Sequence, residues 1–297
     1  MHRPAKRRLE FDEARLYEYP QHLREAIADM PCAPGVYIFH AEEGDLPLYI
    51  GKSVNLRSRL LSHLRTADEA RMLRQTRRIS HIRTAGEIGA LLLEARLIKE
   101  LHPLFNQKLR RSRQLCALRM NGDRPEVVYS RDLNFATEAG IYGLFSSQRA
   151  AQERLRALAD QHKLCYGALG LEKLPPGKAC FRAMLRQCAG VCRGDESAAD
   201  HRQRLFTGLD ALQIVTWPYP GAMGLIERWA AVGDEASSAP HPHDFQIHVV
   251  RHWCYLGSVS TRQEAVALDT VHAAFDADAY KILCKPVLSG QAEMVLL

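Results

Sequence analysis

The chain reads PGVYIFHAEEGDLPLYIGKSVNLRSRLLSH over residues 34–63, and this stretch decides the fold. Two runs of apolar and aromatic residues flank Gly44 and Asp45, a pattern that predicts a β-hairpin with these two residues in its turn. After the second run, the Asn55 side chain can accept a hydrogen bond from a free amide of a first helical turn. We therefore expect a helix that begins after Asn55 and runs through Leu64.

Side chains alternate between the two faces of a strand. The expected hairpin therefore has one core-like face, which consists of Val36, Ile38, Leu48 and Ile50. Tyr37 and Tyr49 fall on the opposite face, where they lie side by side and can meet. Tyrosine is common in strands for packing alone, so this pair needs a second signal before it indicates a site.

The second signal is Glu94, within a run from Glu87 to Leu101 whose apolar spacing is helical. On a helix surface the neighbours of a residue lie three and four positions away. For Glu94 all four are apolar, namely Ala90, Leu91, Leu97 and Ile98. A carboxylate in an apolar stripe costs free energy unless a partner pairs with it. That partner is either an arginine or a divalent cation, and the spacing leaves both open. Glu87 and Glu100 lack such surroundings and are expected to be ordinary surface residues.

Together these residues resemble the GIY-YIG nuclease family. Gly35-Val36-Tyr37 stands in place of the first family motif with one mild change, and Tyr49-Ile50-Gly51 matches the second. The family's further residues follow in its order and at its spacing: Arg59, Glu94 and Asn106. The resemblance implies an endonuclease domain over residues 34–113, with a three-stranded sheet and flanking helices, and hydrolysis of a phosphodiester to 3′-hydroxyl and 5′-phosphate ends.

The resemblance also implies roles for individual side chains. Glu94 would hold one divalent cation, Mg²⁺ or Mn²⁺, that stabilises charge on the phosphate and on the leaving oxygen. Tyr49 would be the general base for the attacking water, with its reference pKa of about 10 lowered by positive charge from Lys52, Arg59 and the cation. Arg59 would also bind the non-bridging phosphate oxygens with its planar donors.

Three further side chains complete the expected site. Tyr37 would hold Tyr49 or the water in place. Asn106 would orient the local backbone or the Glu94 region. His63 stands where related nucleases often have a tyrosine, and it could hydrogen-bond or transfer a proton.

Charge is concentrated on the same stretch. The net charge of the 297 residues is +6, yet residues 34–113 hold 15 Lys and Arg against 8 Asp and Glu, and the remainder is close to neutral. A basic surface suits the phosphate backbone of DNA, although a solvated basic face without a partner has the same composition. We expect DNA contacts from one strip, formed by Lys108, Arg110, Arg111 and Arg113.

Four of the eight cysteines lie close together, with fourteen, seven and three residues between them: Cys165, Cys180, Cys188 and Cys192. Basic residues are interleaved with them and favour thiolates. Four thiolates suit a [4Fe–4S] cluster or a structural Zn²⁺, and four separate thiols are the simpler alternative. The separations are wider than the paired knuckles of zinc ribbons, so we favour the iron–sulfur cluster over zinc.

This cysteine segment extends the resemblance. Residues 180–192 are similar to the segment that follows the nuclease domain in the UvrC family, the incision nucleases of bacterial nucleotide excision repair. A full UvrC continues with a UvrB-binding hairpin, a second nuclease domain and paired helix-hairpin-helix motifs, for which this chain leaves no room. The short architecture resembles the stand-alone UvrC-homologous excinucleases that make the 3′ incision. The resemblance implies damaged double-stranded DNA as substrate, UvrB as partner with UvrA as its loader, and a monomer.

The expected fold class is α+β, with the nuclease domain followed by a Cys-cluster region and a C-terminal α+β region. We divide the chain into a basic N-terminal arm, the nuclease domain, a hairpin and helix region with the four cysteines, and a C-terminal region without an assigned role: residues 1–33, 34–113, 114–195 and 196–297. In the last region we expect a strand over Phe245–Val250, a helix from Thr261 and a strand over Tyr280–Cys284. No apolar run has the length of a membrane span and no secretory signal follows the basic N-terminus, so we expect a cytoplasmic protein.

Two other functions fit the same residues. A partner-independent, structure-specific nuclease of the same type would cut branched or specific DNA by itself. A non-catalytic module would hold DNA through the basic face and the cluster, and it would keep its function after removal of Glu94.

Overall fold

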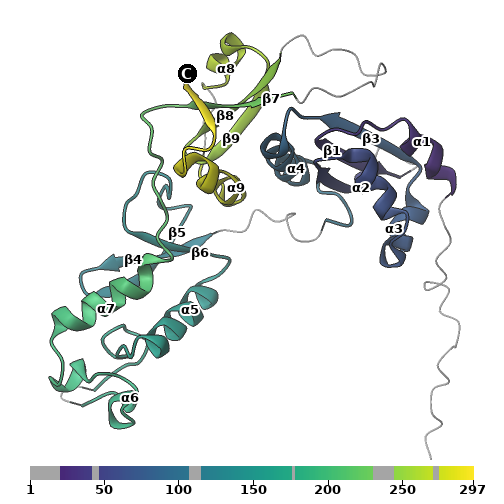
Figure 1. Ribbon diagram of the computed structural model, residues 1–297. Helices are drawn as coiled ribbons and strands as arrows, with labels where there is room; N and C mark the ends of the chain where they lie inside the picture. Colours follow the sequence, from purple (N-terminus) through teal and green to yellow (C-terminus); the bar gives the residue numbers. More distant parts are fainter. Residues whose placement is uncertain (1–20, 42–46, 107–114, 176–177, 230–243, 270–273) are drawn as a thin grey trace, which may run out of the picture.

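The computed structural model describes residues 21–41, 47–106, 115–175, 178–229, 244–269 and 274–297 (Figure 1). Helices combine with three separate antiparallel sheets, which confirms the expected α+β class. The expected turn at Gly44 and Asp45 lies outside the described residues, as do residues 1–20 of the basic arm. Within the described ranges, no helix combines the length and the apolar character that a membrane crossing requires.

The nuclease region contains one three-stranded sheet with helices on both faces. Its strands, in the spatial order β2-β1-β3, are β1 (Gly35–His40), β2 (Pro47–Ser53) and β3 (Arg78–Arg83). Its helices are η2 (Gln21–Leu23), α1 (Arg24–Ala28), α2 (Leu56–His63), η3 (Ala67–Glu69), α3 (Ala70–Gln75) and α4 (Glu87–Leu101). As expected, Asn55 caps α2, because its side chain accepts a hydrogen bond from the Ser58 amide at 3.0 Å.

The two faces of the hairpin have separate cores. Val36, Ile38 and Ile50 pack against Ile98 of α4, as the alternation predicts. Leu48 does not join them, and this part of the prediction is wrong. The pairing of β1 with β2 shifts between Phe39 and His40, so Leu48 packs with the aromatic core on the other face, which α1, α2 and α3 cover.

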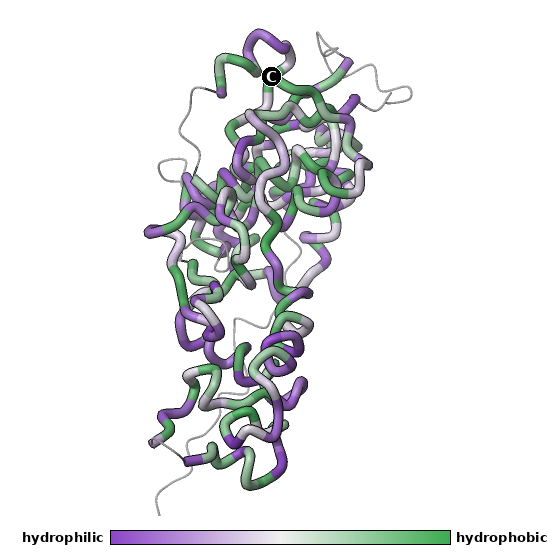
Figure 2. Tube along the Cα trace, turned by 90° about the vertical axis from the view of Figure 1, so that its left-hand side faces the viewer, coloured by the Kyte–Doolittle hydropathy of each residue, from purple (hydrophilic) through white to green (hydrophobic). Residues whose placement is uncertain are grey.

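The middle region forms the second unit. Its strands, in the order β5-β4-β6, are β4 (Cys116–Asn121), β5 (Arg124–Tyr129) and β6 (Ile141–Phe145). Its helices are α5 (Gln148–Gln161), α6 (Phe181–Met184), η4 (Val191–Arg193) and α7 (Ala198–Asp210). Although α7 begins beyond residue 195, Leu205 and Leu209 of this helix pack into the same core as the sheet and α5. Figure 2 shows an elongated molecule with this region at one end.

The C-terminal unit is a four-stranded sheet with two helices. Its strands, in the order β10-β7-β8-β9, are β7 (Met223–Arg228), β8 (Phe245–Arg251), β9 (Cys254–Val259) and β10 (Glu293–Leu296). Its helices are α8 (Arg262–Leu268) and α9 (Ala277–Leu288). The strands β7, β9 and β10 were not expected from the sequence.

The expected strand over Tyr280–Cys284 is wrong, because these residues lie in α9. The Asp276 side chain accepts hydrogen bonds from the first amides of this helix. Leu283 and Val287 recur at helical spacing and are buried against the sheet. The short apolar run fits either structure when read alone, and the Asp276 cap together with the burial of one face selects the helix.

Gly35 tests the packing of the nuclease sheet. A Cβ at this position would lie 2.4 Å from the carbonyl oxygen of Ile82 in β3, which is too close for any side chain. We expect Gly35→Ala to lower the free energy of unfolding by about 1–3 kcal/mol through overpacking, measured by urea denaturation of the full chain. The control is Gly221→Ala, because a Cβ on Gly221 meets no atom of the described residues within 4 Å. Equal stability of the two variants would contradict this packing.

Candidate nuclease site and cysteine cluster

Two tyrosines meet on the hairpin, as the alternation predicts. The ring centroids of Tyr37 and Tyr49 lie 6.2 Å apart. Gly51 pairs with Tyr37 across the strands, and a Cβ on Gly51 would lie 2.3 Å from the Tyr37 hydroxyl and 2.9 Å from the Tyr49 ring. The glycine of the second motif is therefore required because both rings occupy the space above it.

Tyr37 is the first member of a buried chain of hydrogen bonds. Its hydroxyl contacts Nε2 of His63 at 2.5 Å, and Nδ1 of His63 contacts the carboxylate of Glu69. The Glu69 carboxylate only accepts, so Nδ1 carries the proton and Nε2 accepts from the tyrosine hydroxyl. Burial lowers the pKa of His63 although Glu69 acts to raise it, which favours the neutral imidazole. This geometry leaves Tyr37 and His63 with defined donor and acceptor roles.

Arg59 lies one turn before His63 on α2, and its guanidinium hydrogen-bonds to the Tyr37 hydroxyl. This bond raises the pKa of Arg59. The pKa of Tyr37 is raised, first by burial and then by Tyr49, although Arg59 opposes both. Tyr37 therefore stays protonated and acts as a hydrogen-bonded support.

The pKa of Tyr49 differs from expectation. Burial raises it most, Glu94 raises it further, and Arg59 lowers it. Arg59 lowers this pKa as expected, but without the expected cation burial and Glu94 outweigh it.

Glu94 connects α4 to β2. Its Oε1 atom accepts the Lys52 main-chain amide at 3.0 Å. Burial raises the pKa of Glu94, while the Lys52 amide and the charges of Lys52 and Arg59 oppose that rise. Throughout the part of the chain that the structure describes, Glu94 forms no ion pair with an arginine and its Oε2 atom has no hydrogen-bond donor. A half-buried carboxylate oxygen is a suitable ligand for a hard divalent cation.

Lys52 directs its side chain elsewhere. Its Nζ atom pairs with Oε1 of Glu87 at 2.6 Å. Glu87 is exposed, as expected, but it holds this partner in a surface ion pair. The Lys52 ammonium group therefore lies at the N-terminal end of α4, while the Lys52 main-chain amide binds Glu94.

The Asn106 side chain both accepts a hydrogen bond from the backbone of β2 and donates one to it. Its Oδ1 atom accepts the Ile50 amide at 2.8 Å, and its Nδ2 atom donates to the Ile50 carbonyl at 2.8 Å. The side chain thus pairs with the outer edge of β2 as a neighbouring strand would. This contact holds the strand segment that carries Tyr49 and Gly51.

The four predicted cysteines come together in the middle region. Sγ of Cys180 lies 3.5 Å from Sγ of Cys165 and 3.7 Å from Sγ of Cys188, and the Cys180 amide donates to Sγ of Cys192 at 3.3 Å. All but Cys192 are buried. Burial raises the pKa of Cys165 to about 12. Burial therefore favours the neutral thiol, and a cation bound among these sulfurs would favour their thiolates.

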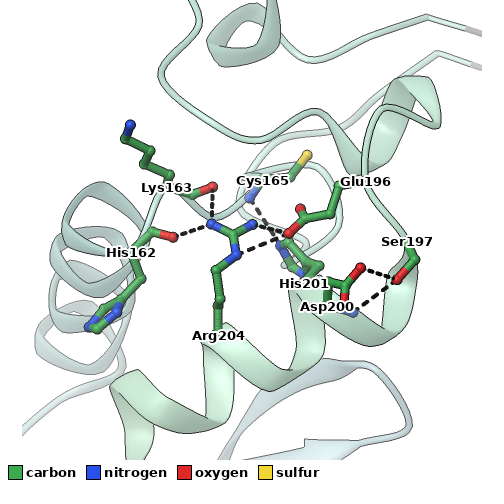
Figure 3. Close-up of polar contacts among 8 residues, drawn as sticks. All are labelled: His162, Lys163, Cys165, Glu196, Ser197, Asp200, His201 and Arg204. Carbon is green, nitrogen blue, oxygen red and sulfur yellow. Dashed lines mark hydrogen bonds and ion pairs between the residues drawn. The ribbon is translucent and has the colours of Figure 1, made fainter.

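Helix α7 supports the cluster from outside (Figure 3). Nε2 of His201 accepts the Cys165 amide at 3.0 Å, which fixes that backbone segment. Arg204 donates to the His162 carbonyl at 2.5 Å and to Oε1 of Glu196 at 3.0 Å. These contacts join three segments around Cys165: the C-terminal end of α5, the loop that follows η4, and helix α7.

The sulfur separations allow a test of the two metal alternatives. A tetrahedral zinc ion with Zn–S bonds of about 2.3 Å separates its ligands by about 3.8 Å, which resembles the two distances from Cys180. The sulfurs of Cys165, Cys180 and Cys192 all lie within 4.8 Å of one another, whereas Cys188 is not part of this group. A [4Fe–4S] cluster is larger and requires the thiols to move apart. The donor set fits both centres, because each takes four thiolates.

Some site residues behave differently from the sequence predictions. Glu69 was missed, because its contact with His63 depends on the turn between α2 and η3. An acidic residue six positions after a histidine carries no recognisable spacing signal. The expected DNA strip lies outside the described residues: Lys108, Arg110, Arg111 and Arg113.

Comparison with protein families accounts for most of the chain. Residues 33–107 match the UvrC-like GIY-YIG domain, residues 115–210 match the UvrC/Cho excinuclease middle domain, and residues 222–297 match the excinuclease Cho C-terminal domain. The three matches follow the three units of the structure.

Curated relatives cover nearly the full length. Excinuclease Cho of Escherichia coli (strain K12) is 54% identical over 97% of this chain and 93% of that protein. Excinuclease Cho of Salmonella typhimurium is 52% identical over 97% of this chain and 94% of that protein. UvrABC system protein C of Caldicellulosiruptor saccharolyticus is 29% identical over 58% of this chain and 30% of that protein.

A solved structure matches the nuclease region alone. The GIY-YIG N-terminal endonuclease domain of UvrC from Thermotoga maritima, bound to its catalytic divalent cation magnesium, is 35% identical over 29% of this chain and 97% of that chain, with a TM-score of 0.27. The full-length relatives and the three matched domains together lead to one conclusion: the chain belongs to the excinuclease Cho family and is a DNA endonuclease of excision repair.

Proposed function

We propose that the protein nicks the damaged strand on the 3′ side of a lesion, within a complex that UvrB forms on DNA after UvrA has loaded it. The observation that carries this proposal is the Glu94 carboxylate, held by the Lys52 amide beside Tyr49 and Arg59. The relative named UvrABC system protein C supports a role beside UvrA and UvrB. We further propose that the protein acts on DNA in the cytoplasm and that it acts as a monomer.

We propose that Glu94 holds one divalent cation, Mg²⁺ or Mn²⁺. Bound there, the cation supplies Lewis-acid charge for the phosphate and the leaving oxygen, and it offsets the carboxylate charge that raises the pKa of Tyr49. Arg59 would bind a non-bridging phosphate oxygen through the guanidinium nitrogens that do not contact Tyr37. Lys52 would add positive charge, because it already opposes the rise of the Glu94 pKa from its place at the start of α4.

Tyr49 is the better candidate for general base of the two tyrosines. Tyr37 is almost fully buried and is engaged with His63 and Arg59, so it cannot take up a proton from water. Tyr49 is half-buried, and its pKa responds to the charges of Glu94 and Arg59. In the phenolate form, which the bound cation and Arg59 would favour, Tyr49 would accept the proton of the attacking water, while Tyr37, His63 and Glu69 hold its ring in position.

DNA would also contact residues outside the nuclease site. We propose that the basic strip after Asn106, formed by Lys108, Arg110, Arg111 and Arg113, contacts the DNA backbone. Backbone contacts position a nuclease but do not read sequence. Selection of the damaged strand would therefore depend on UvrB.

The first test is strand-resolved nick mapping on a duplex with one bulky lesion, labelled on the damaged strand, in the presence of Mg²⁺. We expect a single nick on the 3′ side that requires UvrB and UvrA and that is lost in Glu94→Gln, because the amide cannot replace a carboxylate as a cation ligand. Gel mapping with and without UvrB provides the measurement.

The same experiment separates the alternatives. Cutting that ignores both the lesion and UvrB would keep the nuclease and overturn the repair complex. Equal activity of wild type and Glu94→Gln would exclude the proposed cation site.

Glu69→Ala tests the buried hydrogen-bond chain. Without the carboxylate, His63 loses the partner that fixes its tautomer, and Tyr37 and Tyr49 lose a defined position. We expect the single-turnover nicking rate to fall about tenfold to a hundredfold, with a new Nε2-protonated form of His63 in ¹⁵N NMR spectra. The control is Glu100→Ala, which removes an exposed partner of Arg96. A tautomer change without a change in rate would show that the chain is structural only.

We propose that Cys165, Cys180, Cys188 and Cys192 hold one metal centre. The spacing in the sequence favours [4Fe–4S], whereas the sulfur separations resemble those around Zn²⁺. Either centre would supply a cross-link for a segment with little regular structure, between α5 and α7. The reaction at Glu94 does not require it.

Metal analysis of protein purified without oxygen distinguishes the two centres. Iron, sulfide and a broad visible absorption band identify [4Fe–4S], whereas colourless protein with one zinc ion per chain identifies the zinc site. We expect Cys188→Ser to lose the metal and Cys116→Ser to retain it, because Cys116 lies in the core of the middle sheet. Wild-type protein that contains neither metal would refute the proposed centre.

A further inference from the structure

Helix α4, which carries Glu94, lies between two sheets (Figure 1). On one side Leu93, Leu97 and Ile98 pack on the hairpin of the nuclease region. On the other side Ile88 and Leu92 belong to the core of the C-terminal unit. The orientation of Glu94 therefore depends on both units.

The start of α4 has no cap from its own sequence. Gly86 is the N-cap residue and has no side chain to accept the free amides. Glu227 of β7 takes this role from the C-terminal unit. Its Oε1 atom accepts the Ile88 amide at 3.0 Å, and its Oε2 atom accepts the Gly89 amide at 2.8 Å. Free amides at a helix start attract a carboxylate, because the helix dipole adds to their hydrogen bonds.

Glu227 is itself held in place. Nε2 of the fully buried His248 donates to its Oε2 atom at 2.9 Å, and Nδ1 of His248 contacts the Ser258 hydroxyl at 2.6 Å. Burial acts to raise the pKa of Glu227, but the hydrogen bonds from His248 and the two amides outweigh it and lower that pKa. A Cβ on Gly89 would lie 2.4 Å from the His248 ring, so the helix approaches this carboxylate closely.

The far end of α4 is bound to the same unit. Nζ of Lys99 pairs with Asp276 at 2.6 Å and with Asp278 at 2.9 Å, at the start of α9. Glu94 lies between the two contacts, five residues from each of Gly89 and Lys99. A small rotation or displacement of the first turn would move the Glu94 carboxylate relative to the Lys52 amide and Tyr49.

We propose that Glu227 is a positioning residue of the nuclease site: by capping α4 from the C-terminal unit, it sets the orientation in which Glu94 binds its cation. This inference rests on the proposed cation site at Glu94. It also assigns a role to the C-terminal unit, which completes the support of a helix that the nuclease region holds on one side only.

The test measures Mn²⁺ binding to the full chain by electron paramagnetic resonance, independently of DNA cutting. Glu227→Ala should raise the dissociation constant of the Glu94-dependent Mn²⁺ site about tenfold, the usual effect of removing a residue that orients a metal ligand. The matched control is Glu293→Ala, because Glu293 belongs to the same sheet and pairs with Arg228 on its surface without contacting α4. The control should bind Mn²⁺ like wild type.

A second variant separates capping from docking. A Cβ at Gly86 would lie 2.3 Å from Oε1 of Glu227, so a serine does not fit there in the wild type. Once Glu227 is replaced by alanine the space is free, and Ser is a preferred N-cap residue. The double variant Gly86→Ser with Glu227→Ala should recover most of the lost Mn²⁺ affinity, whereas Gly86→Ser alone should weaken it.

The outcomes distinguish this inference from the proposed function. If Glu94→Gln binds Mn²⁺ as wild type does, the cation site is wrong and the inference fails with it. If binding depends on Glu94 but Glu227→Ala equals wild type, only the inference is overturned. A loss in Glu227→Ala that the added serine does not restore also overturns capping. If Glu227→Ala does not fold, as judged by circular dichroism, Glu227→Gln keeps one acceptor oxygen and is held to the same criteria.

Discussion

The hydrogen bond from the Lys52 amide to Glu94 joins the two parts of the nuclease site, and the other features of the site depend on it. A carboxylate on an otherwise apolar helix stripe loses solvation when the helix packs on the sheet. The β2 amide replaces part of that solvation and brings the carboxylate beside Tyr49. Arg59 of α2 lies close enough to oppose the rise of both pKa values.

Around this contact the two tyrosines have different environments. Tyr37 is buried and hydrogen-bonds to His63 and Arg59, so its side chain is held in a fixed position. Tyr49 is half-buried and lies on the side of the carboxylate. Similar residues on one face of a hairpin thus acquire different roles, because solvent access and hydrogen-bond partners decide which of them can exchange a proton.

Helix α4 also connects the nuclease region to the C-terminal unit. Its two apolar sides belong to two cores, and Glu227 and Lys99 fix its two ends. The Glu94 carboxylate therefore lies on an element that neither unit holds alone. The middle unit contacts the C-terminal unit through Phe275 and Tyr280, and its cysteine cluster lies away from that contact, in a separate core.

The sequence by itself determined the hairpin, the boundaries of α4, the cap at Asn55 and the residues gathered at the site, because these depend on local periodicity and on motif spacing. It did not determine that Tyr280 lies in a helix, that Leu48 leaves its expected face, or that burial and Glu94 raise the pKa of Tyr49. The sequence also did not predict the contacts of Glu69 with His63 and of Glu227 with α4. Each of these depends on side chains that only folding brings together, and on the solvent that packing removes, so the tertiary structure alone decided them.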